Sequence, residues 1–290
     1  MNADSQQFRS ISDFSVRRAG IITKKEDGPA ALFADKLGRW LEQKGITGSL
    51  NRIAPDIDIL IILGGDGTLL HIAAEAARYS IPVIGINLGH LGFLTELTEN
   101  EAEEALERII SGSIVVENRL MLKACLVKNG VNQGYRYALN DVVINKNSLD
   151  RVLHLSAQAN DEFITTYKAD GLIISTPTGS TAYNLSAGGP LVYPGLASIL
   201  VTPICPFMLS SRPVLLPSNI TITTRFDVQN YTENANIIID GQPSWSMHKD
   251  DVLEVKAAEH PLQLIVSPHK DYFAILRNKL RWGIQESGRG

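Results

Sequence analysis

The sequence predicts two domains: an α/β domain with an open, mostly parallel sheet, and an all-β domain of sandwich type. Two observations lead to this prediction. Strand and helix patterns alternate over the first third of the 290-residue chain, and that order builds parallel sheets with helices on both faces. From residue 113 to about residue 268, short β-rich runs separated by turn residues follow, as in sandwiches. We therefore expect the α/β domain over residues 1–115 and the β-rich domain over residues 116–268.

Each element of the first domain has a pattern of its own. Apolar, β-branched runs of the kind buried in parallel sheets predict strands at residues 17–23, 57–63 and 81–88. Apolar residues at helical spacing predict helices at residues 29–44, 68–79 and 98–110. Thr98 and Glu101 have the spacing of a capping box, which fixes the start of the last helix. The order is Rossmann-like, and such sheets bind ligands beyond the carboxyl ends of their strands.

The elements of the second domain follow from its apolar runs and its turns. β-Rich runs predict strands at residues 121–127, 135–144, 164–167, 172–175, 220–225, 237–239 and 262–266. Turn pairs separate several of them, namely Asn129-Gly130, Asn160-Asp161 and Asp240-Gly241. Residues 271–282 have one apolar helical face. We expect this C-terminal helix, which lies within residues 269–290, to return to the first domain.

The composition is that of a globular protein. Hydrophobic residues make up 44% of the chain and charged residues 20%, which excludes a disordered chain. A net charge of −4 without runs of like charge argues against a nucleic-acid binder. No apolar stretch reaches the length of a membrane span, and the polar N-terminus has no apolar signal core, so we expect a cytoplasmic protein. Cys125 and Cys205 lie in apolar segments without zinc-ligand spacing, which predicts buried free thiols.

The most informative segment is the glycine-rich loop Gly64-Gly65-Asp66-Gly67-Thr68, which lies between a predicted buried strand and a predicted helix. The glycines let backbone amides approach a ligand, and the helix start adds free N–H groups with a positive dipole. The loop is therefore a candidate phosphate cradle. Asp66 suits either of two tasks in phosphoryl transfer, accepting the proton of an attacking hydroxyl or holding Mg²⁺. The alternative is a tight turn in which Asp66 only caps the helix.

This loop resembles the GGDGT signature of the superfamily of NAD kinases, diacylglycerol and sphingosine kinases, and phosphofructokinases. The resemblance implies ATP-dependent phosphorylation of a hydroxyl group. It also implies that Gly64, Gly65, Gly67 and Thr68 contact the ATP phosphates, but it does not choose the substrate.

A second segment, residues 170–189, is rich in hydroxyls and glycines. Its hydroxyls are able to bond ribose and phosphate oxygens, although a plain polar turn would have a similar composition. Its full string, which begins Asp-Gly, closely resembles the motif of the NAD kinase family. The resemblance implies that NAD is bound by residues of this segment, namely Asp170, Thr178, Thr181, Ala182, Tyr183, Asn184, Leu185 and Ser186.

Further matches to the same family lie on both sides of this segment. Asn140-Asp141 stands where the family usually has Asn-Glu, the pair that bonds the ribose hydroxyls of NAD. Residues 210–213 resemble a family segment ending in Arg-Pro, and Phe207 stands where many members have His. The resemblance further implies NAD contacts by Gly67, Phe93 of the 87–94 loop, Arg151, Lys168 and Gln242 of Asp240-Gly241-Gln242. His71, three residues into the helix after Thr68, is a further candidate from its position on the site side of that helix, and packing of the helix face is an equal alternative. Without the family, Asp240-Gly241 reads as a hairpin turn, and the basic residues as solvated side chains.

The resemblance thus implies an NAD kinase that transfers the γ-phosphoryl group of ATP to the 2′-hydroxyl of the adenosine ribose of NAD. It implies Asp66 as the catalytic base, Mg²⁺ carried by the ATP phosphates with Asp66 as a candidate ligand, and an active site between two domains. It also implies self-association as a homodimer or homotetramer, with no nucleic-acid or membrane partner.

Two other functions stay open from the sequence. A lipid or sugar kinase would share the glycine-rich loop, but it leaves residues 170–189 unexplained. A non-catalytic NAD-binding sensor would have no use for the carboxylate of Asp66. A dehydrogenase is disfavoured, because no GxGxxG motif follows the first predicted strand.

Overall fold

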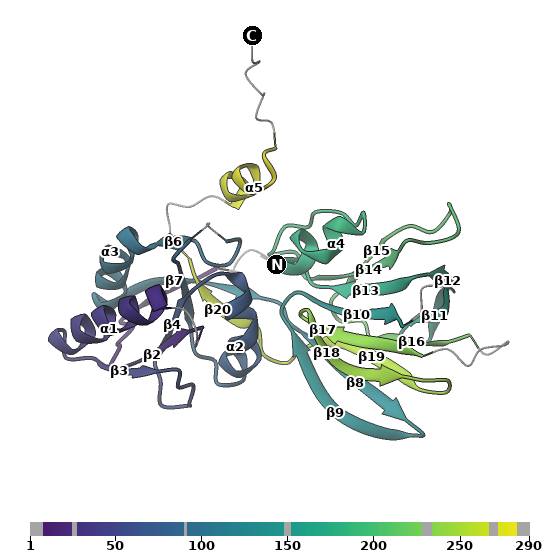
Figure 1. The fold of residues 1–290 in the computed structure, drawn as a ribbon, viewed down its shortest axis with the longest axis horizontal. Helices are drawn as coiled ribbons and strands as arrows, with labels where there is room; N and C mark the ends of the chain where they lie inside the picture. The colour runs from purple at the N-terminus through teal and green to yellow at the C-terminus, as the bar shows by residue number, and fades with distance from the viewer. Residues whose placement is uncertain are drawn as a thin grey trace, which may run out of the picture. The chain divides into compact units, whose positions relative to one another are not determined.

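The computed structural model describes residues 8–24, 28–89, 92–147, 152–227, 234–266 and 272–282. These residues form two compact units (Figure 1). Unit 1 comprises the described part of Met1–Asn118 and Gln263–Gly290, and unit 2 comprises that of Arg119–Leu262. Among the described residues, no helix combines the length and the apolarity needed to cross a membrane.

Unit 1 is built on an eight-stranded sheet that is mostly parallel, as predicted. Its main path runs in the order β1-β7-β20-β5-β4-β2-β3, and β6 pairs with β5 off this path. The pairs β2–β3, β2–β4, β4–β5, β5–β6 and β20–β5 are parallel, whereas β1–β7 is antiparallel. The strands are β1 (Phe8–Ser12), β2 (Arg18–Thr23), β3 (Thr47–Leu50), β4 (Ile59–Leu63), β5 (Val83–Asn87), β6 (Leu97–Thr98), β7 (Ser113–Arg119) and β20 (Leu262–Ile265).

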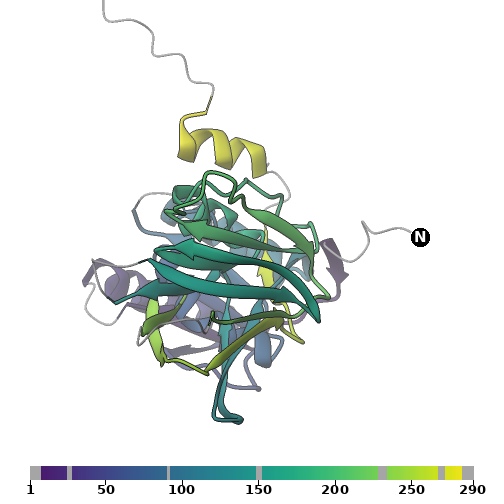
Figure 2. The ribbon, with the colours of Figure 1, turned by 90° about the vertical axis from the view of Figure 1, so that its right-hand side faces the viewer.

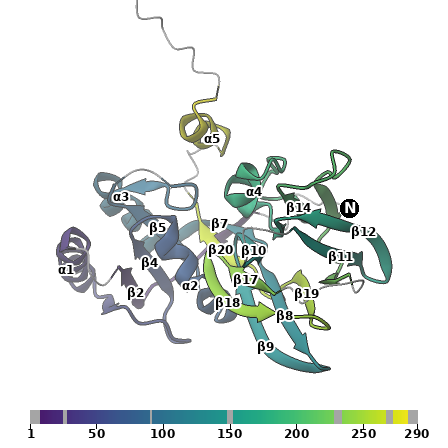
Figure 3. The same ribbon diagram turned by 45° about the vertical axis from the view of Figure 1, so that its right-hand side comes forward.

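Helices cover both faces of this sheet because its central strands are apolar on both faces. In β4, Ile59, Ile61 and Leu63 share a core cluster with side chains of α1 (Gly28–Gln43) and α3 (Glu99–Ile110). The alternate residues of β4, also buried, point to the opposite face, where α2 (Asp66–Arg78) contacts the strand (Figure 3). Burying each such side chain contributes about 1.5–3 kcal/mol.

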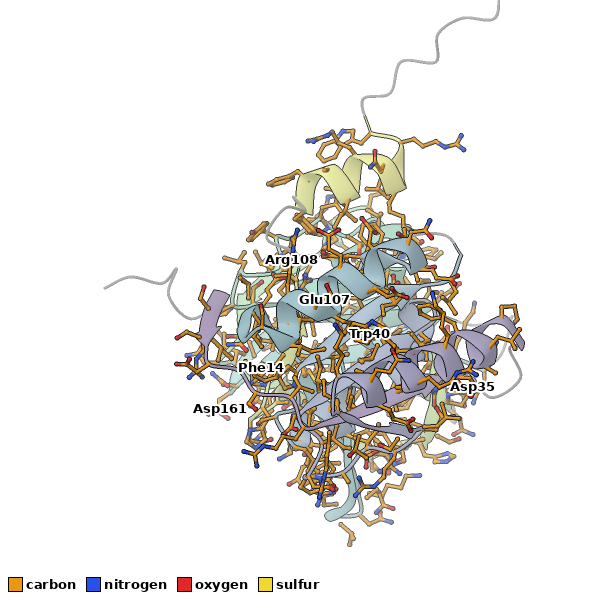
Figure 4. All side chains as sticks on the ribbon, turned by 90° about the vertical axis from the view of Figure 1, so that its left-hand side faces the viewer. Phe14, Asp35, Trp40, Glu107, Arg108 and Asp161 are labelled. Carbon is orange, nitrogen blue, oxygen red and sulfur yellow. The ribbon has the colours of Figure 1, made fainter. Side chains whose placement is uncertain are left out.

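Helices α1 and α3 lie side by side on their face of the sheet, where Figure 4 labels Trp40 of α1 and Glu107 of α3. Lys44 Nζ lies 2.9 Å from Glu107 Oε1 and 5.4 Å from the centre of the Trp40 ring. The capping box predicted for α3 is confirmed, since Glu101 Oε2 accepts hydrogen bonds of 2.8 Å from both the Thr98 N–H and the Thr98 hydroxyl.

Several strands of unit 1 differ from what the sequence predicts. The run at residues 262–266 was expected in the β-rich domain, but β20 lies in the sheet of unit 1, between β7 and β5. Four of the five residues in this run are apolar, which suits the centre of a covered sheet equally well. Strands β1, β3, β6 and β7 were not predicted; β1, β3 and β6 are short and have few apolar residues, so they carry little pattern.

The C-terminal helix is present as α5 (Tyr272–Leu280) and is assigned to unit 1.

Unit 2 is a sandwich of two six-stranded antiparallel sheets, as predicted, and its strands face the viewer in Figure 2. One sheet has the order β15-β14-β13-β10-β17-β18 and the other β12-β11-β16-β19-β8-β9. Side chains of both sheets form one core cluster. The strands are β8 (Leu122–Lys128), β9 (Val131–Ala138), β10 (Asp141–Lys146), β11 (Leu153–Ala159), β12 (Glu162–Ala169), β13 (Gly171–Ser175), β14 (Ser198–Ile204), β15 (Val214–Pro217), β16 (Ile222–Phe226), β17 (Ala235–Ile239), β18 (Gln242–Met247) and β19 (Val252–Ala257).

The run at residues 135–144 was predicted as one strand but forms parts of two. It is interrupted at Leu139 and Asn140, where the chain passes from β9 in one sheet to β10 in the other. The predicted hairpin turns are present, with positive φ at Asn129, Asn160 and Asp240.

The other face of β10 and β13 is covered by the segment that follows β13. This segment contains a 3₁₀ turn (Thr178–Thr181) and the one-turn helix α4 (Tyr183–Ser186). Ala187 packs there against Val143 and Ile173. Cys125 is buried as predicted, whereas Cys205 is exposed, which makes the prediction for it wrong.

Candidate functional site

The glycine-rich loop connects the end of β4 to the start of α2. The helix begins at Asp66, two residues earlier than predicted, and Gly65 is its N-cap residue. A Cβ atom built on Gly65 or Gly67 would have nothing within 4 Å. The loop therefore presents an open backbone at a helix N-terminus, where free N–H groups and the helix dipole favour an anion.

The side chain of Asp66 does not cap its own helix. Its carboxylate instead accepts hydrogen bonds from the turn at residues 92–95. Oδ2 accepts the N–H of Phe93 at 2.8 Å, and Oδ1 accepts the N–H groups of Leu94 and Thr95 at 3.0 and 3.2 Å. The Thr95 hydroxyl donates a further bond of 3.2 Å to Oδ1. The simple capping alternative is thus wrong, since no side-chain cap bond is present and Asp66 follows the N-cap position.

A buried network of polar side chains holds the turn at residues 92–95. Thr95 is fully buried, and its hydroxyl accepts a bond of 3.0 Å from Nδ2 of Asn87, the last residue of β5. Asn87 Oδ1 in turn accepts the N–H of Gly89 at 2.8 Å. The ends of β4 and β5, which are neighbours in the sheet, are therefore linked through the Asp66 carboxylate.

Two other predicted contacts of unit 1 lie near these elements. Phe93 belongs to the turn held by Asp66 and is half-buried. His71 is exposed on α2, one helical turn after Gly67, and it has a partner of its own. Within the 87–94 loop, residues 90 and 91 lie outside the described residues.

In unit 2, the turn at Leu139, Asn140 and Asp141 connects the two sheets. Its three N–H groups all donate to the carboxylate of Asp240, at 2.7, 2.8 and 3.0 Å. Its carbonyl oxygens accept from β13 and the residue after it. Leu139 O accepts the Thr176 hydroxyl at 2.6 Å, and Asn140 O accepts the Thr176 N–H at 2.9 Å.

Residues 170–189 pack directly on this turn. A Cβ atom on Gly179 would lie 2.6 Å from both the carbonyl carbon of Asn140 and Ser175 Oγ, so a larger residue has no room there. The Gly179 N–H donates to Thr176 Oγ1 at 3.0 Å. Three of the four motifs predicted in this domain, namely Asn140-Asp141, residues 170–189 and Asp240-Gly241-Gln242, are thus brought together, although they are up to a hundred residues apart.

The predicted binding residues between 178 and 186 divide into exposed and buried groups. Tyr183 and Ser186 are exposed, and Thr181, Ala182 and Leu185 are half-exposed. Thr178 is buried, and its hydroxyl has no hydrogen-bond partner among the described residues, which suits a ligand contact.

Asn184, a predicted NAD contact, is fully buried. Its Nδ2 donates to Ser180 O and Pro190 O at 3.3 and 3.1 Å, and its Oδ1 accepts the Thr202 hydroxyl of β14 at 2.6 Å. Its side chain therefore holds the loop's shape and ties the loop to β14, and one lone pair of Oδ1 remains.

Asp170 has a basic partner that the sequence analysis did not predict. Lys146 Nζ lies 2.6 Å from Asp170 Oδ1, and the Lys146 N–H donates to Asp170 O at 3.1 Å. The pairing follows from the register of β10 with β13, in which Asn145 lies opposite Gly171. Lys168 and Gln242 are exposed, and Arg151 lies outside the described residues.

Asp141 and Asp240 form a close acidic pair. Burial, and then the charge of Asp240, raise the pKa of Asp141 to about 7. Burial also raises the pKa of Asp240, although its three backbone N–H donors act in the opposite direction. The sequence analysis missed Asp240 because Asp-Gly is an ordinary hairpin turn; its placement opposite Asn140 depends on strand pairing between β10 and β17.

Among the described residues, no group of three or more His, Cys, Asp or Glu side chains is arranged to hold a metal ion. A divalent ion at the glycine-rich loop would therefore depend on ligands from a bound phosphate, with Asp66 as the one carboxylate of the loop.

Two family models match the chain. The ATP-NAD kinase N-terminal domain matches residues 46–114, and the ATP-NAD kinase C-terminal domain matches residues 139–267. Relatives named NAD kinase are similar over most of the chain. That of Syntrophotalea carbinolica is 39% identical over 285 residues, covering 92% of this chain and 99% of the relative. That of Geobacter metallireducens is 40% identical over 283 residues, with the same coverage.

Solved structures agree with these relatives. The crystal structure of yeast NADH kinase complexed with NADH has a TM-score of 0.80 and 25% sequence identity, and it covers 93% of this chain and 89% of that one. The crystal structure of an NAD kinase from Archaeoglobus fulgidus in complex with ATP has a TM-score of 0.72 and 25% identity, covering 91% of this chain and 98% of that one.

Proposed function

From the premise that the chain belongs to the NAD kinase family, and is thus a phosphotransferase acting on NAD, we propose the following reaction. The 2′-oxygen of the adenosine ribose of NAD attacks the γ-phosphorus of ATP. An O–P bond forms to NAD, the bond from the γ-phosphorus to the β,γ-bridging oxygen breaks, and ADP leaves. Asp66 accepts the proton of the 2′-hydroxyl. The products are NADP and ADP.

The observation that carries this proposal is the state of the Asp66 carboxylate. Among the described residues, Oδ2 accepts only the Phe93 N–H, so it keeps a lone pair that can accept a proton. The bonds to Leu94 and Thr95 fix the orientation of the group through Oδ1. A positioned carboxylate beside an open phosphate cradle matches the needs of phosphoryl transfer, in which catalysis is chiefly positioning and charge stabilisation.

We assign the ATP phosphates to the open backbone of Gly64, Gly65, Gly67 and Thr68 at the start of α2. The free N–H groups of the helix would stabilise negative charge on the phosphates. A divalent cation such as Mg²⁺ would be held by the phosphates, since the free lone pair of Asp66 Oδ2 is assigned to the proton of the 2′-hydroxyl. When bound, it would neutralise charge that develops on the transferred group.

We assign NAD to the motifs of unit 2, together with Gly67, His71 and Phe93 of unit 1. Asn140 and Asp141 would bond the ribose hydroxyls, and Tyr183 offers an exposed ring face to a base. The remaining assigned contacts are Arg151, Lys168, Asp170, Thr178, Thr181, Ala182, Asn184, Leu185, Ser186 and Gln242.

We also propose self-association, as a homodimer or homotetramer. The support is an exposed apolar loop between β14 and β15, which we call the 207–209 loop. Its three consecutive residues Phe207, Met208 and Leu209 are 78%, 47% and 91% exposed. Side chains of this size are depleted from free surfaces and enriched in subunit contacts. A cytoplasmic location stays a prediction from the sequence.

The test of the reaction is to incubate the purified protein with ATP, Mg²⁺ and NAD and to quantify NADP, with Asp66→Asn measured in parallel. We expect NADP from the wild type and a rate lower by about 10²–10⁴-fold in the variant. Because Asp66 also anchors the 92–95 turn, NAD affinity and melting temperature are measured on both proteins.

Retained NAD binding with lost turnover would support Asp66 as the base. NADP formation by Asp66→Asn at a rate near that of the wild type would overturn the assignment. The absence of NADP from the wild type, with NAD bound, would favour a sensor instead.

A further inference from the structure

The main-chain N–H and carbonyl groups of the turn at residues 139–141 are hydrogen-bonded to other parts of the protein. Asp240 accepts its three N–H groups, and Thr176 donates to the carbonyl oxygens of Leu139 and Asn140. The Ser175 hydroxyl adds a bond of 3.2 Å to Asn140 O. These hydrogen bonds, to Asp240 from the N–H groups and from Ser175 and Thr176 to the carbonyl oxygens, restrict the backbone of the turn to one conformation.

The side chains of Asn140 and Asp141 in this turn differ from its backbone in their hydrogen bonding. Within the described residues, neither the amide of Asn140 nor the carboxyl of Asp141 makes a hydrogen bond to another protein group. Asn140 is half-buried and Asp141 is 5% exposed. Buried polar side chains are normally paired, so a pair left without protein partners on a rigid backbone is suited to an external partner.

We propose that Asp240 is a positioning residue for NAD: it fixes the main chain of Leu139, Asn140 and Asp141 and thereby aims the side chains of Asn140 and Asp141 at the nucleotide. This inference rests on the proposed function, which places the ribose hydroxyls of NAD on those two side chains. Asp240 itself contacts no substrate in this scheme. The charge of its carboxylate strengthens the hydrogen bonds from three successive N–H groups of the turn.

Asp240 has a second effect on Asp141 through its charge. Burial first, and then the charge of Asp240, raise the pKa of Asp141 to about 7. A neutral Asp141 donates a hydrogen bond as well as accepting one, which matches a ribose hydroxyl that is both donor and acceptor.

The test compares Asp240→Asn with the wild type and with the control Asp251→Asn. Asp240 has φ of 46°, a conformation that Asn tolerates, so this variant keeps the backbone and the side-chain size. It replaces one acceptor oxygen by an NH₂ donor that faces main-chain N–H groups. Asp251 is a matched control because it is also buried at a turn of unit 2, where it accepts the His248 N–H at 2.8 Å.

We expect Asp240→Asn to raise the KM for NAD by at least about tenfold while the KM for ATP stays near the wild-type value. Hydrogen–deuterium exchange of the peptide containing residues 139–141 should become faster in this variant. Asp251→Asn should change neither quantity. A folded Asp240→Asn protein with the wild-type KM for NAD would overturn the inference.

A second pair of variants approaches the turn from its other side, in case Asp240→Asn does not fold. Thr176→Val removes the hydroxyl bond to Leu139 O and should raise the KM for NAD, whereas Thr176→Ser keeps the hydroxyl and should restore it. Equal KM values for these two variants would count against the inference. If the wild type formed no NADP, the proposed function would fail, and NAD affinity with hydrogen exchange would still test Asp240.

Discussion

A Cβ atom on Gly92 would lie 2.7 Å from Cγ of Asp66, because the turn at residues 92–95 folds its backbone directly over that carboxylate. The Gly92 N–H donates to Thr95 O at 3.2 Å, which closes the turn. Glycine at position 92 is therefore required by the close approach of the backbone to the carboxylate. The position of the Asp66 carboxylate therefore depends on Gly92, which has no side chain.

We predict that Gly92→Ala lowers kcat by about 10²-fold, because the added methyl group displaces the carboxylate that accepts the proton. The overlap should also cost about 1–3 kcal/mol in the free energy of unfolding. Steady-state kinetics and urea denaturation measure the two effects. Gly38→Ala on α1 is the control, since a Cβ atom there has nothing within 4 Å and should be tolerated. Equal kcat values for Gly92→Ala and Gly38→Ala would contradict the prediction.

A pH dependence of stability follows from Asp141. Its pKa is about 7 in the folded protein, against an ordinary value of 3.8 that applies to the unfolded chain. The folded state therefore binds the extra proton between these values, and the free energy of unfolding falls as pH rises through about 7. The slope from this group is at most about 1.4 kcal/mol per pH unit, and the pair with Asp240 titrates together.

The measurement is urea denaturation of the wild type and Asp141→Asn at pH 5, 6, 7 and 8. The neutral amide has no proton to lose, so its stability relative to the wild type should increase from pH 5 to pH 7 and level off by pH 8. Asp161→Asn, which removes an exposed carboxylate in the same unit, should follow the wild type at every pH. Parallel curves for the wild type and Asp141→Asn would show that Asp141 is ionised throughout.

The Lys146–Asp170 pair should contribute more to stability than the pairs on the surface. Its side chains are only 17% and 32% exposed, whereas those of Lys44 and Glu107 are 39% and 57% exposed. We predict that Lys146→Met lowers the free energy of unfolding by about 1–3 kcal/mol, because it leaves Asp170 without its partner in a partly buried position. Lys44→Met should cost less than about 0.5 kcal/mol. Thermal denaturation of both variants tests this difference, and equal losses would contradict it.

The sequence was sufficient for the strands β2, β4 and β5 of the sheet and for the loop that follows β4. Five consecutive apolar residues from Ile59 to Leu63 favour a strand that is covered on both faces. Three glycines around Asp66 favour a loop whose backbone is open to a ligand. The start of α2 was misplaced by two residues because Asp66 itself is helical, and its side chain bonds a turn that lies 27 to 29 residues further along the chain.

What the sequence did not predict depends on strand register and tertiary pairing. Lys146 meets Asp170, and Asp240 meets Asn140, only because β10 lies between β13 and β17. The bond from the Thr202 hydroxyl of β14 to Asn184 Oδ1 likewise joins residues that no local pattern connects. The hydrophobic pattern along the chain predicts helices and strands. The partners of a polar side chain depend instead on which strands pair and in which register.

The 207–209 loop provides a final prediction about assembly. We expect the wild type to be a dimer or tetramer and Leu209→Ser to weaken its association by at least about tenfold, because a large apolar side chain central to an interface commonly contributes more than 1 kcal/mol. Light scattering coupled to size-exclusion chromatography over a range of concentrations gives the mass. Leu32→Ser is the matched control, since Leu32 on α1 is also 74% exposed but stands outside the loop. A wild type that remains monomeric, or two variants that dissociate equally, would show that these three apolar side chains have another purpose.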